Sequence, residues 1–172
     1  DAWFDRSQTQ ALIVQKDGHI VYQRYSSDAD DGRNINAMSM SKAIIALLVG
    51  VAIDDGFINS EHDAVSRYLP QIAERAGDAV TLRDLLRHTS GIETASKDIK
   101  ATLKGHPLRT PLSEISFNGG RSFHYDNINY HILSLVLTEI YKKPLNQLID
   151  DKLWKPLGLE GAAIINTAGY CC

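Results

Sequence analysis

Cysteine is scarce in this 172-residue chain, and it occurs at only one place. The two cysteines, Cys171 and Cys172, are adjacent, and adjacent cysteines rarely pair with each other. They match no metal-ligand spacing and say little about the compartment in which the protein works. The localisation therefore stays open, with periplasm and cytoplasm both compatible with the sequence.

Long hydrophobic runs and clusters of positive charge are also missing. The longest apolar run, Ala43 to Ile53, has eleven residues and is too short to cross a bilayer, and the opening "DAWFDRSQTQ" is not a signal peptide. The net charge is −3 with a pI of about 6.1, and no Lys/Arg patch stands out. We therefore expect no membrane span and no nucleic-acid partner.

The composition that is present suits a folded domain. Hydrophobic residues make up 44% and charged residues 23% of the chain, which is ordinary for a globular protein. The length is enough to bury a core, and no repeat, low-complexity segment or clear linker divides it. Residues 1–172 are therefore expected to form a single domain.

The chain begins with a predicted hairpin and continues mainly with helices. "ALIVQKDGHIVYQRYSS", within residues 10–26, has two apolar runs around Asp17-Gly18, a strong tight-turn signal. A polar loop, 28–36, leads into a helical region over 37–160. Its first helix should run from about Ser39 to Asp54 or Asp55, with Gly56 as its stop, and should be buried on nearly all sides because it is apolar almost all round.

Three more helices and one long loop are expected further on. A long surface loop over 93–122, with a short helix around Ser96 to Leu103, is predicted from weak patterning. The three helices are Leu82 to Arg87 with Thr81 as its N-cap, "NINYHILSLVLTEIYKK" ending before Pro144, and "PLNQLIDDKLWKPLGL" closed by Lys155-Pro156.

Ser39-Met40-Ser41-Lys42 is the first candidate for chemistry. In a helix, residues three apart share a face, so Lys42 would lie close to the Ser39 hydroxyl. A serine is a poor nucleophile until a base takes its proton, and a lysine kept neutral by burial can do this. Free N–H groups at the helix start could bind an oxyanion. About one such S-x-x-K pair is expected by chance in this sequence, so the pattern alone is weak evidence for a catalytic role.

The position of Lys42 is stronger evidence for a catalytic role than the pattern. It lies at the head of a buried apolar helix, where a lysine is costly unless it is paired or functional. The alternative is a lysine that extends to the surface from the first turn.

Tyr125-Asp126-Asn127 is the second candidate. It follows a glycine-rich loop and precedes a helix, a place where a chain can present polar side chains to a cleft. Tyr125 could act as a phenolate base or relay, and Asn127 could donate its amide to a substrate carbonyl. Asp126 or Asn127 could equally cap the helix, and both roles can hold together.

The histidines and Tyr130 are given structural roles. His124 and His131 are seven apart and could share a helix face, but a metal site lacks a third ligand. His88 lies at a helix end, where it would favour the C-terminal dipole. The Tyr130 hydroxyl is expected to form a buried hydrogen bond. No metal or cofactor is therefore expected.

Five stretches, in order, carry a family resemblance. They are "ALIVQKDGHIVYQRY", "SMSKAIIALLVGVAIDDGFI", "VTLRDLLRHTSGI", "FHYDNINYHILSLVL" and "WKPLGL". With these the sequence resembles the serine β-lactamase and penicillin-binding protein superfamily. It looks most similar to the branch with class C β-lactamases, D-aminopeptidase-like enzymes, family VIII carboxylesterases and 6-aminohexanoate-dimer hydrolases.

The resemblance implies roles for four residues. Ser39 matches the acylated nucleophile, Lys42 the lysine that assists its deprotonation, Tyr125 the base and relay, and Asn127 the residue that binds the substrate amide. The Ser39 N–H would form half of the oxyanion hole. Whether Lys42 or Tyr125 is the base stays open.

The resemblance also implies an α/β (α+β) fold, a helical domain beside an antiparallel sheet with the active site between them. The family's third motif, K-T-G or H-x-G on a strand lining the cleft, does not follow Tyr125 here. We therefore expect residues 1–172 to be the N-terminal part of the domain, with the remaining strands in a missing C-terminal part. The hairpin and the Ser39 helix should then expose apolar surface.

The resulting hypothesis is a serine hydrolase that forms an acyl-enzyme on a small amide or ester: a β-lactam, a D-peptide, a short ester or an amino-acid oligomer. The alternative is a catalytically silent relative that serves as a binding or sensing module, because fold does not fix function. Metal-dependent hydrolysis is the third hypothesis.

Overall fold

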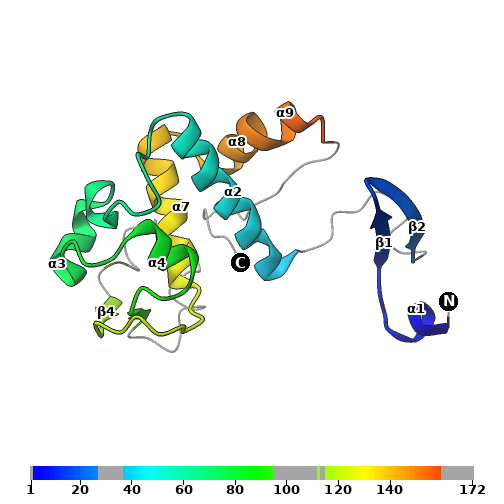
Figure 1. Ribbon diagram of the computed structural model, residues 1–172, viewed down its shortest axis with the longest axis horizontal. Coiled ribbons are helices and arrows are strands. Elements are labelled where there is room, and N and C mark those ends of the chain that lie inside the picture. The colour runs from blue at the N-terminus through cyan, green and yellow to red at the C-terminus, as the bar shows by residue number, and fades with distance from the viewer. Residues whose placement is uncertain (1, 27–36, 95–111, 113–114, 160–172) are drawn as a thin grey trace. The chain divides into compact units, whose positions relative to one another are not determined.

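The computed structural model describes residues 2–26, 37–94, 112 and 115–159 (Figure 1). The chain divides into two compact units, Asp1–Ala37 and Met38–Cys172, and each is described by itself. Helices and short antiparallel strands both occur, which confirms the predicted mixed class.

Several predictions fall on residues that are not described. These are the polar loop 28–36, the short helix around Ser96 to Leu103, and the cysteines at the end of the sequence. The extent of the domain, including a missing C-terminal part, stays a prediction.

The first unit contains the predicted hairpin. Strands β1 (Ala11–Lys16) and β2 (His19–Tyr25) pair antiparallel, with Lys16 opposite His19 and a bulge after Val14. Asp17 and Gly18 both have positive φ, 50° and 81°, as a tight two-residue hairpin turn requires.

A short helix, α1 (Ala2–Arg6), precedes the hairpin and was not predicted. The Arg24 guanidinium lies 4.5 Å from the centroid of the Phe4 ring and forms a 2.6 Å ion pair with Asp5. Ile13, Ile20 and Val21 are more than half exposed, which agrees with the expected apolar surface on the hairpin.

The second unit is built around two crossing helices, α2 (Ser41–Asp54) and α7 (Ile128–Tyr141). A single turn of 3₁₀-helix, Met38–Met40, leads into α2, and Gly56 follows it with a φ of +79°, as predicted. Helix α7 ends at Lys142, before Pro144, again as predicted.

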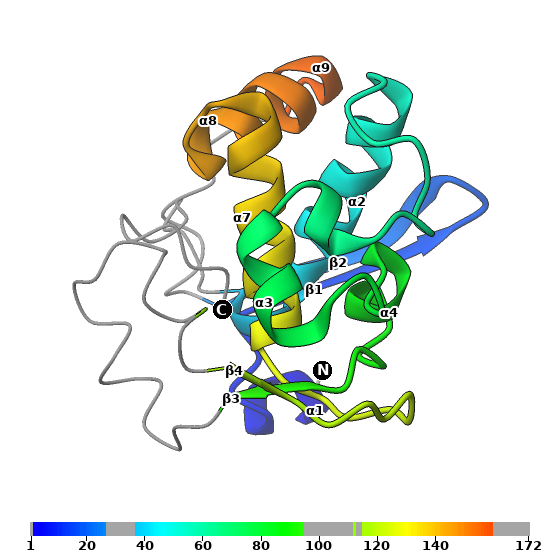
Figure 2. The ribbon, with the colours of Figure 1, turned by 90° about the vertical axis from the view of Figure 1, so that its left-hand side faces the viewer.

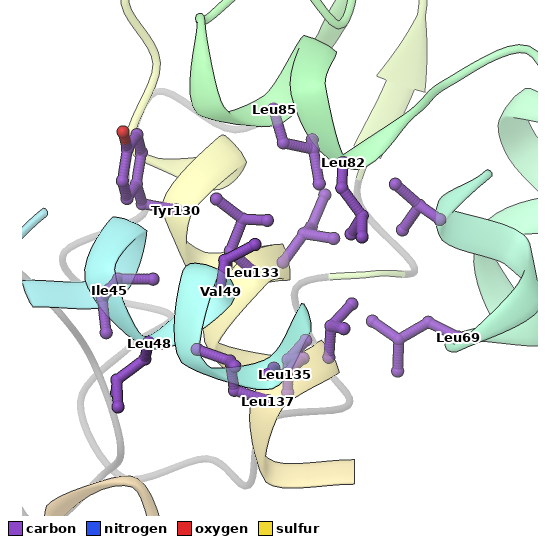
Figure 3. Packing of buried hydrophobic residues seen from close by; sticks show 14 of the residues in the cluster. Ile45, Leu48, Val49, Leu69, Leu82, Leu85, Tyr130, Leu133, Leu135 and Leu137 are labelled. Carbon is purple, nitrogen blue, oxygen red and sulfur yellow. The ribbon is translucent and has the colours of Figure 1, made fainter. Parts of the chain in front are cut away.

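The core of this unit lies between α2, α7 and the short helix α4 (Leu82–Leu86). Figure 3 shows Val49 of α2 close to Leu133 of α7, with Leu85 of α4 above them, and Leu48 and Leu137 belong to the same buried cluster. All five are at most 1% exposed. Burying such a side chain stabilises the fold by roughly 1.5–3 kcal/mol. The core therefore holds the starts of α2 and α7 in place relative to each other.

Helix α4 begins as the sequence predicts. Thr81 is its N-cap, and a reciprocal capping box links Thr81 and Asp84: the Thr81 hydroxyl accepts the Asp84 N–H at 3.2 Å, and the Thr81 N–H donates to Asp84 Oδ2 at 3.0 Å. Short helical turns at Val65–Arg67 and Pro70–Ile72 and helix α3 (Ala73–Ala76) precede it.

Two short strands lie at one end of α7 and the last helices at the other (Figure 2). Strand β3 (Ile92–Thr94) pairs antiparallel with β4 (Ile115–Phe117). After α7, helix α8 (Leu145–Ile149), a π-helical segment (Asp150–Trp154) and α9 (Lys155–Leu157) follow one another without a break.

Three predictions about this unit need correction. The segment 93–122 is not only a loop, because β3 and β4 occur in it. The last helix does not close at Lys155-Pro156: proline fits the first turn of α9, where its missing N–H costs nothing, and the helix ends at Gly158 in a left-handed conformation.

Helix α2 is also not buried on nearly all sides. Ala43, Leu47, Gly50 and Asp54 form an exposed stripe, with Leu47 56% exposed. An apolar run without polar residues cannot indicate which of its faces is covered. The exposed Leu47 agrees with the expected apolar surface on this helix.

Candidate active site

Ser39 and Lys42 lie together at the start of α2. Ser39 is in the 3₁₀ turn before the helix, and Lys42 is in the first helical turn. Lys42 Nζ donates a 3.1 Å hydrogen bond to Ser39 Oγ. The Ser41 hydroxyl donates to the Met38 carbonyl at 2.6 Å and ties the turn that carries Ser39.

Lys42 does not extend to the surface. It is only 6% exposed, and its Nζ lies 5.2 Å from the centroid of the Tyr125 ring and 5.9 Å from that of the Tyr130 ring. Aromatic faces attract a cation at such distances, which offsets part of the cost of burying it. The structure thus brings Ser39, Lys42 and Tyr125 together from two segments far apart in sequence.

Tyr125 and Asn127 lie in the segment that leads into α7. Asp126 makes the cap contact, because its Oδ1 accepts the Ile128 N–H at 3.0 Å. Asn127 is at the N-cap position, but its side chain makes no capping hydrogen bond and is exposed, as is Tyr125 at 51%. The described contacts with Lys42 include the Tyr125 ring but not the Asn127 side chain.

His88 is a member of this cluster that the sequence analysis missed. It follows α4 with a φ of +56° and is 8% exposed. Its ring stacks on Tyr125, with centroids 4.5 Å apart and planes 29° apart. Burial, and next the positive charge of Lys42, lower the pKa of His88 below its ordinary value. The structural role expected for His88 at a helix end stays a prediction, and its stacking on Tyr125 is an addition that was not predicted; the "RHTSG" stretch was the available signal.

A second missed connection joins the same two segments. Ser90 donates a 2.6 Å hydrogen bond to Asn129 Oδ1 and accepts the Ile92 N–H at 3.0 Å. Ser90 is 4% and Asn129 1% exposed, so this pair is buried. Gly91 is required beside it, because a Cβ there would lie 2.4 Å from the Gly120 carbonyl oxygen.

The remaining polar candidates have structural settings. The Tyr130 hydroxyl donates to the Leu86 carbonyl at 3.0 Å, as predicted. His131 is buried within α7, whereas His124 lies before the helix and is exposed. Within the described residues, no three His, Cys, Asp or Glu side chains gather as a metal site, and no helix has the length and apolarity to span a membrane.

Comparison with known proteins places this arrangement in a family. A family model described as beta-lactamase matches residues 4–168. PbpX of Bacillus subtilis (strain 168), named as a candidate penicillin-binding protein, is 29% identical over 172 residues, covering 91% of this chain and 41% of PbpX. The chain thus spans about two fifths of that relative.

Solved structures share the fold. FmtA from Staphylococcus aureus superposes with a TM-score of 0.71 at 19% identity, covering 91% of this chain and 46% of FmtA. A D-amino acid amidase from Ochrobactrum anthropi gives a TM-score of 0.63 at 16% identity, covering 86% of this chain and 44% of the amidase. The match to the family model covers nearly the whole sequence, and the chain therefore belongs to the beta-lactamase family.

Proposed function

We propose that the protein containing this chain is a serine hydrolase that forms an acyl-enzyme on a small amide or ester, with Ser39 as its nucleophile. The observation that carries the proposal is the 3.1 Å contact between Lys42 Nζ and Ser39 Oγ, made by a lysine that is 6% exposed. A buried ammonium costs several kcal/mol, a cost that a role in the reaction would explain.

The chemistry follows from this pair. In its neutral form Lys42 has a lone pair that can accept the Ser39 proton across the same contact. Ser39 Oγ then forms a bond to the carbonyl carbon, and the carbonyl electrons move to its oxygen. Collapse of this tetrahedral species breaks the bond to the leaving amine or alcohol, which takes up the proton. Water releases the acyl group by the same steps.

Tyr125 offers a second route for the proton. Its ring lies against Lys42, so the positive charge of Lys42 would stabilise a phenolate form, which could serve as base or relay. Asn127 at the start of α7 would donate its amide to the substrate, and the Ser39 N–H would supply one oxyanion donor. The relatives' names support amide substrates: one is a penicillin-binding protein candidate and one a D-amino acid amidase.

The proposal is tested by covalent labelling. The protein is incubated with a fluorescent fluorophosphonate and, separately, with a fluorescent penicillin, and the modified peptide is identified by mass spectrometry. We expect one label per chain, on Ser39, and no label in Ser39→Ala. Ser116→Ala is the control and should be labelled like wild type, because Ser116 is an exposed serine on β4, outside the segment that carries Ser39.

Two outcomes would contradict the proposal. One is a folded wild-type protein that neither probe labels, which would favour the silent binding module. The other is labelling that persists in Ser39→Ala. Hydrolysis of nitrocefin, p-nitrophenyl butyrate and a D-alanyl amide by the unlabelled wild-type protein would then distinguish β-lactam, ester and D-peptide substrates.

A further inference from the structure

The His88 ring is a buried neighbour of the Tyr125 side chain. Tyr125 itself is 51% exposed, so only part of its ring is packed against other side chains. The His88 ring, 8% exposed, lies 4.5 Å from the Tyr125 ring in a stacked arrangement. His88 thus provides a wall against which the Tyr125 ring rests, with Lys42 Nζ 5.2 Å from the Tyr125 centroid.

The backbone of the same segment is also bound to His88. Its Nδ1 accepts the Asp126 N–H at 3.4 Å and faces the Asn129 amide at 3.4 Å, and its carbonyl accepts the His124 N–H at 2.8 Å. Because Nδ1 accepts, the proton of the neutral ring is on Nε2. A protonated ring would present a donor to the Asp126 N–H and a second cation to Lys42.

We propose that His88 is a positioning residue for the proposed acyl transfer: its neutral imidazole stacks on Tyr125 and accepts the Asp126 N–H, and so holds the Tyr125 ring against Lys42. This inference rests on the proposed function and adds a residue to it. Displacement of a reacting group by about 1 Å can cost roughly a hundredfold in rate. The turn after α4 therefore controls the geometry of the site without contacting substrate.

The groups that face His88 come from each neighbouring element. They are Lys42 from α2, Tyr125 and Phe123 from the segment before α7, the charged Asp126 and the titratable His124 from the same segment, and Tyr130 from α7. The carboxylate of Asp126 acts on His88 in the direction opposite to Lys42. Neutral His88 is favoured because burial and Lys42 together outweigh that carboxylate.

The test measures the second-order rate constant for fluorophosphonate labelling of Ser39. His88→Asn keeps a side-chain acceptor and tolerates positive φ, but it removes the ring. We expect it to lower the labelling rate at least tenfold at neutral pH. In a Tyr125→Phe background the same change should cost less than threefold, because His88 acts on the Tyr125 hydroxyl through its position. His124→Asn, which alters the exposed neighbouring histidine, should stay within threefold of wild type.

The pH dependence separates positioning from a purely structural role. The advantage of wild type over His88→Asn should be constant above about pH 6.5 and shrink as pH falls below it, because the lowered pKa keeps His88 neutral until then and protonated His88 loses its acceptor. The folded fraction of both proteins is measured by circular dichroism at each pH, and the rates are compared only where both are fully folded. A His88→Asn rate within threefold of wild type, or equal effects with and without the Tyr125 hydroxyl, would overturn the inference.

An NMR measurement that does not depend on activity distinguishes this test from the test of the proposed function. In protein with ¹³C-labelled tyrosine, the Tyr125 ring proton shifts should move when His88→Asn removes the stacked ring, and not in His124→Asn. Unlabelled Ser39 in wild type would contradict the proposed function alone. Unchanged Tyr125 shifts in His88→Asn would contradict the positioning by His88, whatever the labelling result.

Discussion

Ser90 donates a 2.6 Å hydrogen bond to Asn129 across 39 positions of the chain, and this buried contact ties the turn after α4 to the first turn of α7. The Ser90 hydroxyl also accepts the N–H of Ile92, so it binds the backbone at the first residue of β3. The two segments joined in this way are those that carry His88 and Tyr125.

Ser90→Ala is therefore expected to lower the free energy of unfolding by about 1–3 kcal/mol, because it leaves the Asn129 oxygen and the Ile92 N–H buried without this partner. Urea denaturation measures the change. Ser116→Ala, on the exposed side of β4, is the control and should stay within about 0.5 kcal/mol of wild type. A Ser90 effect no larger than this control would mean that the contact contributes nothing net.

Lys42→Met should separate stability from activity. Methionine has a similar length and needs no water, so removing the buried ammonium is expected to leave the free energy of unfolding unchanged or to raise it by up to about 2 kcal/mol. Ser39 labelling should fall at least a hundredfold. Lys143→Met is the control: its side chain is half exposed and pairs with Asp151, so both readouts should change little. A clear loss of stability in Lys42→Met would indicate a structural lysine.

His131 should make the fold sensitive to acid. Burial lowers the pKa of His131 to about 4, whereas the unfolded chain has the ordinary value near 6.5. Between these values the unfolded state binds a proton that the folded state does not. The free energy of unfolding should therefore fall as pH decreases from about 6.5 to about 4, by roughly 3 kcal/mol from this group.

Urea titrations over this pH range check the slope. His131→Gln should reduce the slope of the free energy of unfolding against pH by the contribution of one proton, up to roughly 1.4 kcal/mol per pH unit. Ser116→Ala, which removes no titratable group, should leave the slope unchanged. An equal slope in wild type and His131→Gln would show that His131 does not titrate in this way. His88 contributes in the same direction, since its pKa is also lowered.

Thr81→Ala is expected to destabilise the second unit by about 0.5–2 kcal/mol, because α4 loses the hydroxyl that accepts the Asp84 N–H. Thr81→Ser retains that hydroxyl and should recover most of the loss. Equal stabilities for the alanine and serine variants would assign the effect to the methyl group of threonine and not to the cap.

Local signals predicted the elements that local chemistry determines. Asp17-Gly18 predicted the hairpin turn, and Thr81 predicted the start of α4, because each acts within a few residues. The proximity of Lys42 to Ser39 is of the same kind, since residues three apart meet on a helix.

Local patterns did not predict contacts between distant segments, and the proximity of Tyr125 to Lys42 was expected only from the family resemblance. The place of His88 beside Tyr125 depends on how α4 packs on α7, and no local pattern encodes that packing. Strands β3 and β4 have three residues each, too few to show alternation, and their pairing joins Thr94 to Ile115. Even the exposed face of α2 depends on neighbours and not on its own apolar run.

The pairing of β3 with β4 has a consequence for how the protein could diversify. Because Thr94 and Ile115 are partners, the two ends of the connection between β3 and β4 lie next to each other. The entropy of closing such a connection grows only with the logarithm of its length, by about 0.6 kcal/mol for each doubling. A longer connection should therefore cost little closure entropy as long as Thr94 stays paired with Ile115, so added length need not move Ser90 or His88.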